Sequence, residues 1–234
     1  EHHTPEDVKT CIIRQMGADS SSGWKGKEAA WIEVEDTRKA LQDVGVFCRK
    51  KRSLPLVGVT GSVGKTTTRE MIAAALSTGF HVYKTPGNSN SQVGVPITIA
   101  EIPRDAQIGV IELGMSQPGE MTRIARIAQV DYAVITNIGV THMENLGSRE
   151  NILKEKLHIQ DGMNPDGMLI LNGDDERLRS VIPEGGRKAL FYGMGENCQC
   201  RGQDLHLEHG YPVFTAVFQE GGAQVRPKVM GVHL

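Results

Sequence analysis

The chain has 234 residues, of which 39% are hydrophobic and 23% charged, and its formal net charge is −2 at pH 7. This length is enough for one large domain or two small ones. The near-neutral charge argues against a nucleic-acid or membrane partner held by charge alone. No apolar run approaches the ~20 residues that a membrane-spanning helix needs, and the polar start Glu1–Asp7 does not resemble a signal peptide.

Cysteine is sparse, with residues at positions 11, 48, 198 and 200. Four thiols are too few for a disulfide framework in a chain of this size. The pair Cys198-Gln199-Cys200 lacks the two-residue gap of redox and zinc motifs. We therefore expect reduced thiols and a cytoplasmic protein.

The first 30 residues show no clear hydrophobic period, and Ala18–Gly23 has the small, polar composition of a linker. Trp31–Val34 is predicted to form a short strand. Either Asp36 or Thr37 is expected to cap a helix that runs through Cys48.

From residue 54 onward the pattern alternates between strands and helices. The predicted strands are Leu56–Thr60, His81–Lys84, Ile108–Leu113, Tyr132–Asn137 and Met168–Asn172. The predicted helices are Thr67–Leu76, Gly119–Ile127, Arg149–Gln160 and Asp175–Val181. Several strands are near-continuous apolar runs, as parallel strands covered on both faces require. The sequence therefore predicts an α/β fold with a doubly wound, mostly parallel sheet.

The sequence pattern changes after Ala189. Short strands between glycine-bearing turns are predicted at Ala189–Tyr192, Asp204–Glu208, Val213–Gln219 and Gln224–Met230. We expect them to form a small, largely antiparallel β layer at the edge of the main sheet.

The most informative motif is the turn Gly61-Ser62-Val63-Gly64-Lys65-Thr66, which joins the first of these strands to the first helix. Glycines allow backbone N–H groups to converge on anionic oxygens, and the helix N-terminus adds its dipole. Lys65 would reach the outer phosphates of a nucleotide, and the Thr66 hydroxyl would face Mg²⁺. A strict Walker pattern has glycine at the position of Val59, so this is a shortened variant of the phosphate-binding loop.

Two further polar residues follow strand ends on the same predicted edge of the sheet. Glu112 closes one strand and His142 lies shortly after another. A carboxylate and a hydroxyl near phosphates are typical of a magnesium site, whereas imidazole is an unusual magnesium ligand. From the residues alone, each also has a structural interpretation that involves no metal. Glu112 fits a solvated carboxylate at a strand end, and His142 fits a helix cap or a core histidine.

Two other segments also have an ordinary structural interpretation. Lys156, beside Lys154 and Glu155, has the default interpretation of a solvated helix face. The stretch Gly87–Ser91 is rich in Asn and Ser, which are turn formers, so a turn alone would account for it.

Taken together, these motifs resemble the Mur ligases, the ATP-dependent amide-forming enzymes of peptidoglycan synthesis. The carriers of the resemblance are Thr60–Thr67, Ile111–Met115, Thr136–Gly139 with His142, Lys154–Leu157 and Asn172–Asp175. The resemblance implies that Glu112 and His142 bind magnesium and that Lys156 is carbamylated. Within the family, Gly87–Ser91 running into Gly94–Pro96 is most similar to the branch that adds D-Ala-D-Ala to UDP-MurNAc-tripeptide.

The resemblance also implies a set of site residues. The nucleotide-binding residues are Thr60, Gly61, Ser62, Val63, Gly64, Lys65, Thr66 and Thr67. The metal ligands are Thr66, Glu112, His142 and carbamylated Lys156, and the catalytic residues are Lys65, Glu112, His142 and Lys156. Asn88 and Asn90 are expected to bind substrate. The implied cofactors are ATP and Mg²⁺, and the implied partners are UDP-MurNAc-tripeptide and D-Ala-D-Ala, bound by a monomer.

The matched motifs also predict a domain layout. Residues 1–50 are expected to be a remnant of an N-terminal domain for the UDP-linked substrate, with a linker. Residues 51–234 are expected to be the central ATP-binding domain, truncated at its C-terminal end, with the C-terminal ligase domain absent. We expect such a fragment to be inactive or weak on its own.

Three alternatives stay open at this point. A folylpolyglutamate-synthase-like or other Mur-type ligase would share the loop and act on a different acceptor. A P-loop kinase or GTPase would carry a full Walker loop and, for a GTPase, an Asn-Lys-x-Asp segment, which the sequence lacks. A nucleotide-binding fragment without turnover would bind ATP and form no product.

Overall fold

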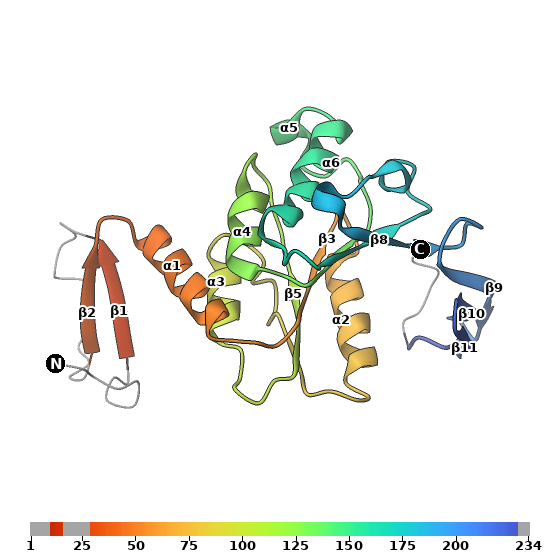
Figure 1. The fold of residues 1–234 in the computed structure, drawn as a ribbon, viewed down its shortest axis with the longest axis horizontal. Coiled ribbons are helices and arrows are strands. Elements are labelled where there is room, and N and C mark those ends of the chain that lie inside the picture. Colours follow the sequence, from red (N-terminus) through yellow and green to blue (C-terminus); the bar gives the residue numbers. More distant parts are fainter. Residues whose placement is uncertain (1–9, 16–28, 229–234) are drawn as a thin grey trace.

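The computed structural model describes residues 10–15 and 29–228, with side chains from residue 32 onward. Its body is a mixed sheet in the order β11-β10-β9-β8-β7-β6-β3-β5-β4 (Figure 1). Six of these strands form a continuous parallel part. They are β8 (Lys188–Gly193), β7 (Met168–Asn172), β6 (Tyr132–Ile135), β3 (Leu56–Thr60), β5 (Ile108–Glu112) and β4 (Val82–Lys84).

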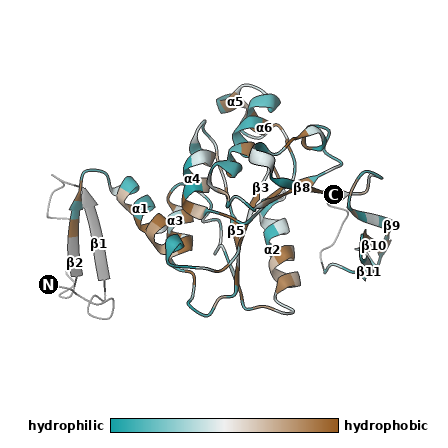
Figure 2. Ribbon diagram, in the orientation of Figure 1, coloured by the Kyte–Doolittle hydropathy of each residue, from teal (hydrophilic) through white to brown (hydrophobic). Residues whose placement is uncertain are grey.

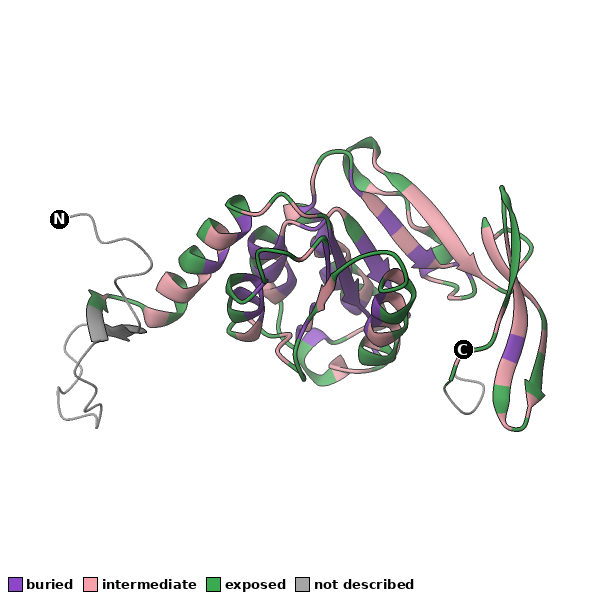
Figure 3. Ribbon diagram, turned by 90° about the horizontal axis from the view of Figure 1, so that it is seen from below, coloured by how far each residue is buried: buried purple, intermediate pink, exposed green. Residues whose placement is uncertain are grey.

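Helices cover both faces of this parallel part. α2 (Lys65–Leu76) packs on one face, where Val57 and Val59 of β3 point. The other face, which includes Leu56, is covered by α3 (Gly94–Ala100), α4 (Glu120–Ala128) and α6 (Arg149–Leu157). The central strands are apolar and buried between the two helix layers (Figures 2 and 3). The doubly wound α/β fold is therefore confirmed.

The chain order places a crevice next to β3. β4 and β5, which follow β3 in the chain, lie on one side of it. The next strands, β6, β7 and β8, lie on the other side. In open α/β sheets, ligands bind beyond the carboxyl ends of the strands at the point where the order reverses. The phosphate loop follows β3 directly, so it lies at that point.

The C-terminal strands form the predicted antiparallel layer. β9 (Cys200–Glu208), β10 (Tyr211–Phe218) and β11 (Gly221–Val225) pair antiparallel with one another and lie at one edge of the sheet (Figure 1). β9 joins the rest of the sheet through a short parallel pairing with β8. The segment Ala189–Tyr192 was predicted as part of this antiparallel layer, but it forms β8, which pairs parallel with β7. The end of the strand predicted at Gln224–Met230 extends beyond the described residues.

At the N-terminal end, β1 (Thr10–Gln15) pairs parallel with β2 (Ala29–Val34), and only the second of these was predicted, as Trp31–Val34. The linker-like Ala18–Gly23 lies outside the described residues. α1 (Thr37–Lys50) is capped by Asp36, whose Oδ1 accepts hydrogen bonds from the backbone N–H groups of residues 38 and 39. α1 packs on α3 and α4.

Two helix predictions need correction. The helix predicted at Asp175–Val181 is wrong, because only a 3₁₀ turn forms there, at Leu178–Ser180. The Asp175 carboxylate accepts the N–H groups of Arg177 and Leu178, which favours a local turn, and Pro183 follows shortly after. The helix predicted at Arg149–Gln160 is divided into α6 and a 3₁₀ segment, His158–Gly162.

Two helices were not predicted. α3 begins three residues after the Asn- and Ser-rich stretch, and the hydroxyl of Ser91, the last residue of that stretch, accepts a hydrogen bond from the Gly94 N–H at 3.2 Å. α5 (Met143–Leu146) is a single turn after His142. Both are too short to show a helical period in the sequence.

The thiols at Cys48, Cys198 and Cys200 are free, and the side chain of Cys11 lies outside the described part. Within residues 10–15 and 29–228, we find no helix with the length and apolar character needed to cross a membrane.

Close packing between α4 and the 3₁₀ segment after α6 gives a stability prediction. A Cβ at Gly162 would lie 1.9 Å from the carbonyl oxygen of Ala125, a backbone atom. We expect Gly162→Ala to lower the free energy of unfolding by about 3 kcal/mol in urea titrations, because the two elements must separate. Gly79→Ala is the control, since a Cβ there meets no atom within 4 Å, and it should change stability by less than about 0.5 kcal/mol.

Candidate functional site

The phosphate loop depends on two glycines. Gly61 has φ 149°, and a Cβ on it would lie 1.9 Å from the Thr136 hydroxyl oxygen. Gly64 has φ 81° and occupies the N-cap position of α2, so no side chain caps the first turn of that helix. The free backbone N–H groups at a helix N-terminus attract anionic oxygens. α2 starts at Lys65, two residues earlier than predicted.

The loop is held from outside by the segment that follows β6. The N–H of Ser62 donates to the Asn137 carbonyl at 3.1 Å, and the N–H of Val63 donates to the Asn137 side chain at 3.1 Å. The Thr136 hydroxyl donates to the Val63 carbonyl at 2.6 Å. The Gly139 N–H donates to the Ser62 hydroxyl at 2.8 Å. These four bonds fix the conformation of the loop.

Lys65 is the first residue of α2. Its ammonium donates to the Gly61 carbonyl at 3.0 Å, so the side chain folds back over the loop. The side chain is half-buried, and this burial lowers the pKa of Lys65. Val59, at the position where a strict Walker loop has glycine, is fully buried against α2 and belongs to the core rather than to the loop.

Glu112 is the last residue of β5, and its side chain is buried, with 1% exposed. The Thr66 hydroxyl donates to Glu112 Oε2 at 2.9 Å, and the Asn90 amide donates to Oε1 at 2.8 Å. The guanidinium of Arg69 lies 3.3 Å from Oε2. The interpretation of Glu112 as a solvated carboxylate is therefore wrong.

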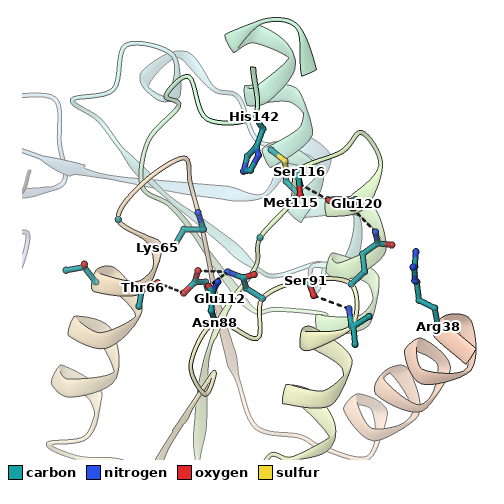
Figure 4. A pocket seen from close by; sticks show the side chains of 16 residues that line it. Arg38, Lys65, Thr66, Asn88, Ser91, Glu112, Met115, Ser116, Glu120 and His142 are labelled. Carbon is teal, nitrogen blue, oxygen red and sulfur yellow. Dashed lines mark hydrogen bonds between the residues drawn. The ribbon is translucent and has the colours of Figure 1, made fainter. Parts of the chain in front are cut away.

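A cavity of about 630 Å³ lies between these elements (Figure 4). The predicted site residues that line it are Gly64, Lys65, Thr66, Thr67, Asn88, Asn90, Glu112 and His142. The structure adds Arg38, Ser91, Gln92, Val93, Gly114, Met115, Ser116 and Glu120 to this lining. Thr60, Gly61, Ser62, Val63 and Lys156 are not among the lining residues. Thr60 is buried, and in the described part its hydroxyl has no hydrogen-bond partner.

His142 points into the cavity from the side opposite Glu112 (Figure 4). It occupies the N-cap position of α5 with φ 66°, but its side chain makes no capping hydrogen bond. Burial and the nearby ammonium groups of Lys156 and Lys65 lower the pKa of His142, which favours the neutral imidazole.

Lys156 is one of the most deeply buried side chains, with 2% exposed, so its interpretation as part of a solvated helix face is wrong. Burial, together with the positive charge of Lys65, lowers the pKa of Lys156 to about 7. In the region that the structure describes, its ammonium makes no hydrogen bond and no ion pair. The neighbouring Glu155 instead accepts the N–H groups of Gly119 and Met121, both at 3.0 Å, and so anchors α6 to the start of α4.

The donor set beside the phosphate loop fits a magnesium ion. The described residues contain no cluster of three His, Cys, Asp or Glu side chains of the kind that holds a metal by protein ligands alone. Mg²⁺ instead takes one or two protein oxygens and completes its shell with phosphate oxygens and water. The Glu112 carboxylate and the Thr66 hydroxyl provide such oxygens at the edge of the cavity.

Sequence reasoning missed Arg69 and the bond between Asn90 and Glu112. Arg69 lies four residues after Lys65, so both side chains share one face of α2. That spacing was the available signal, although it does not identify Glu112 as the partner. Gly114 is also part of this arrangement, because a Cβ on it would lie 2.9 Å from the Asn90 amide.

The fold and this site define a P-loop nucleotide-binding domain of the α/β class. A family model described as the Mur ligase middle domain matches residues 59–234. The chain belongs to the Mur ligase family and carries the middle domain of that family.

Individual relatives agree with the family assignment. The chain is 43% identical over 186 residues to a UDP-N-acetylmuramoyl-tripeptide–D-alanyl-D-alanine ligase of Bacillus subtilis (strain 168), covering 80% of this chain and 40% of that protein. Its fold matches a crystal structure of MurF from Acinetobacter baumannii with a TM-score of 0.81 and 31% identity, over 88% of this chain and 46% of that one. MurF ligase from Thermotoga maritima in complex with ADP matches with a TM-score of 0.76 and 30% identity, over 87% and 47%. The chain thus spans less than half the length of these relatives.

The burial of Lys156 predicts a specific pH dependence of stability. Its folded-state pKa of about 7 lies below the ~10.4 of an unfolded lysine, so the unfolded chain holds the extra proton between these values. Stability should therefore rise with pH above 7, at up to about 1.4 kcal/mol per pH unit. In CO₂-free buffer, Lys156→Met should remove this rise and stabilise the protein near pH 7. The control Lys154→Met, on the exposed face of α6, should still show stability that increases with pH. If Lys156→Met leaves the dependence of stability on pH unchanged, the lowered pKa of Lys156 is contradicted.

Proposed function

We propose that this chain is the ATP-binding part of an ATP-dependent ligase that joins D-Ala-D-Ala to UDP-MurNAc-tripeptide in the cytoplasm. The observation that supports this most directly is the contact between Thr66 and Glu112, which lies beside the phosphate loop in the cavity. The relatives from Bacillus subtilis, Acinetobacter baumannii and Thermotoga maritima carry the names of such ligases. The domain boundary near residue 50 stays a prediction.

The proposed reaction has two steps. A carboxylate oxygen of the tripeptide attacks the γ-phosphorus of ATP, ADP leaves, and an acyl phosphate forms. The amine of D-Ala-D-Ala then attacks the acyl carbon, phosphate leaves, and the amine loses a proton to give the amide. Neither step needs a protein nucleophile, so the protein acts by positioning and charge neutralisation.

The phosphate loop would bind the β- and γ-phosphates. The backbone N–H groups at the start of α2 would face the phosphate oxygens, and Lys65 would leave the Gly61 carbonyl to reach them. Thr60 to Thr67 would thereby form the nucleotide-binding segment. In this arrangement the γ-phosphate would face the cavity, and the attacking carboxylate would lie there.

Thr66 and Glu112 would hold a Mg²⁺ ion, which neutralises phosphate charge when bound. His142 and Lys156 would hold a second cation nearer the acceptor. Neutral Lys156 can add to CO₂ and release a proton, which gives a carbamate with anionic oxygen ligands. Its burial and its lowered pKa support this assignment, since they favour the neutral amine that carbamylation requires.

Asn88 and Asn90, which line the cavity, would bind the substrate whose carboxylate is activated. The Asn90 amide nitrogen donates both to the Asn88 side chain and to Glu112, each at 2.8 Å. Asn90 therefore orients the carboxylate, and Asn88 orients Asn90. An acceptor bound at this loop would lie next to the proposed cation site.

The role of Lys65 predicts a loss of nucleotide binding. Lys65→Ala should weaken ADP binding at least tenfold in calorimetry, because it removes a cation next to the phosphates, while the melting temperature stays close to that of the unmodified protein. The control Lys188→Ala, an exposed lysine at the start of β8, should bind ADP normally. A folded Lys65→Ala protein with undiminished ADP affinity would show that the phosphates bind elsewhere.

Whether this middle domain supports ligation can be tested in a chimera in which residues 59–234 replace the matching segment of the Bacillus subtilis relative. With ATP and Mg²⁺, we expect it to convert UDP-MurNAc-tripeptide and D-Ala-D-Ala to the pentapeptide product, detected by mass spectrometry. The same chimera with Lys65→Ala should form none. A folded, ATP-binding chimera that forms no pentapeptide product would contradict the proposed function.

A further inference from the structure

The buried cation Arg69 links three segments of the site. It lies on α2, one turn after Lys65, and only 4% of the residue is exposed. Its Nη1 donates to the Gly87 carbonyl at 2.8 Å and lies 3.3 Å from Glu112 Oε2. Its Nη2 donates to Glu70 at 2.6 Å. A buried guanidinium must be matched by acceptors, and here those acceptors come from α2, from β5 and from the loop that starts at residue 87.

Arg69 contacts the same oxygen of Glu112 as Thr66 does. Glu112 Oε2 accepts from both Arg69 and the Thr66 hydroxyl, while Oε1 accepts from Asn90. Both carboxylate oxygens are therefore fixed in direction by donors from other segments. A carboxylate held in this way is already oriented toward the cavity edge at Thr66.

The same guanidinium also fixes the loop that lines the far side of the cavity. The carbonyl of Gly87 immediately precedes Asn88, and the loop is attached a second time where Asn90 bonds to Glu112. Arg69 is in turn held by Glu70, which pairs with Lys84 of β4. The planar guanidinium thus joins α2 to the loop Gly87–Ser91 through one rigid group.

We propose that Arg69 is a positioning residue that sets the Glu112 carboxylate and the loop Gly87–Ser91 in place together, so that the cation site at Thr66 and Glu112 is formed before the nucleotide binds. This inference rests on the proposed function of that site. Arginine is required because a lysine ammonium is a point charge without the fork that joins Gly87 to Glu112 and Glu70.

The test is ADP binding to this chain by calorimetry, with Mg²⁺ and with a chelator. The ratio of the two affinities measures how much Mg²⁺ strengthens binding. Arg69→Lys keeps the buried positive charge and should lower this ratio at least fivefold, with the metal-free affinity unchanged within twofold. Glu70→Gln, at a partly exposed residue, releases the outer anchor of the guanidinium and should lower the ratio by a smaller factor.

Two reference variants complete the binding experiment. Glu112→Gln should abolish the effect of Mg²⁺. Arg126→Gln, an exposed arginine on α4, should leave both affinities unchanged. A second readout needs no ligand: in amide NMR spectra, the signals of Asn88 and Asn90 should shift or broaden in Arg69→Lys and should not change in Arg126→Gln.

The possible failures are distinct. If Mg²⁺ strengthens ADP binding through Glu112, but Arg69→Lys leaves both the ratio and the loop signals unchanged, the positioning role is overturned and the proposed function stands. A higher ratio in Arg69→Lys would mean that the guanidinium competes with the cation, which also overturns it. If the unmodified chain shows no effect of Mg²⁺, the proposed cation site itself fails, and the inference fails with it.

Discussion

The site is organised around one buried carboxylate, that of Glu112. An ionised carboxylate away from water is costly unless hydrogen-bond donors surround it. The donors here are Thr66 and Arg69 of α2 and Asn90 of the loop before α3. Because all three donors bond to one carboxylate, α2 and the loop before α3 both contact the end of β5.

The strand order makes this convergence possible. β3 and β5 are parallel neighbours, so the phosphate loop after β3 and Glu112 at the end of β5 lie at the same edge of the sheet. β6 flanks β3 on the other side and supplies the segment that holds the loop through Thr136 and Asn137. The phosphate loop thereby lies between the ends of β5 and β6, and it borders the cavity.

Much of the fold follows from local sequence pattern. The strands around β3 are apolar runs bounded by turn residues, and each predicted strand of the parallel sheet has a counterpart in the structure. The failures are local too. Asp175 accepts the N–H groups of Arg177 and Leu178 where a helix was predicted, and the Ser91 hydroxyl accepts the N–H of Gly94, the first residue of the unpredicted α3. In both cases a polar side chain bonds to the nearby backbone, and hydrophobic periodicity does not register such bonds.

The site was less predictable than the fold. The phosphate loop was readable from spacing, because glycine conformation and helix start are local properties. The burial of Lys156 and the pairing of Arg69 with Glu112 depend on segments that are distant in sequence and meet only in the folded sheet. From the residues alone Lys156 had the pattern of a solvated helix face, and only the family resemblance indicated otherwise.

The most direct test of the account is a crystal structure of this chain with Mg²⁺ and a non-hydrolysable ATP analogue. The account predicts the β- and γ-phosphates at the N-terminus of α2, with Lys65 moved from the Gly61 carbonyl to the phosphates. It also predicts a Mg²⁺ ion coordinated by Thr66 Oγ1 and a Glu112 oxygen. Phosphates bound away from α2, or a cation that does not contact Glu112, would contradict it.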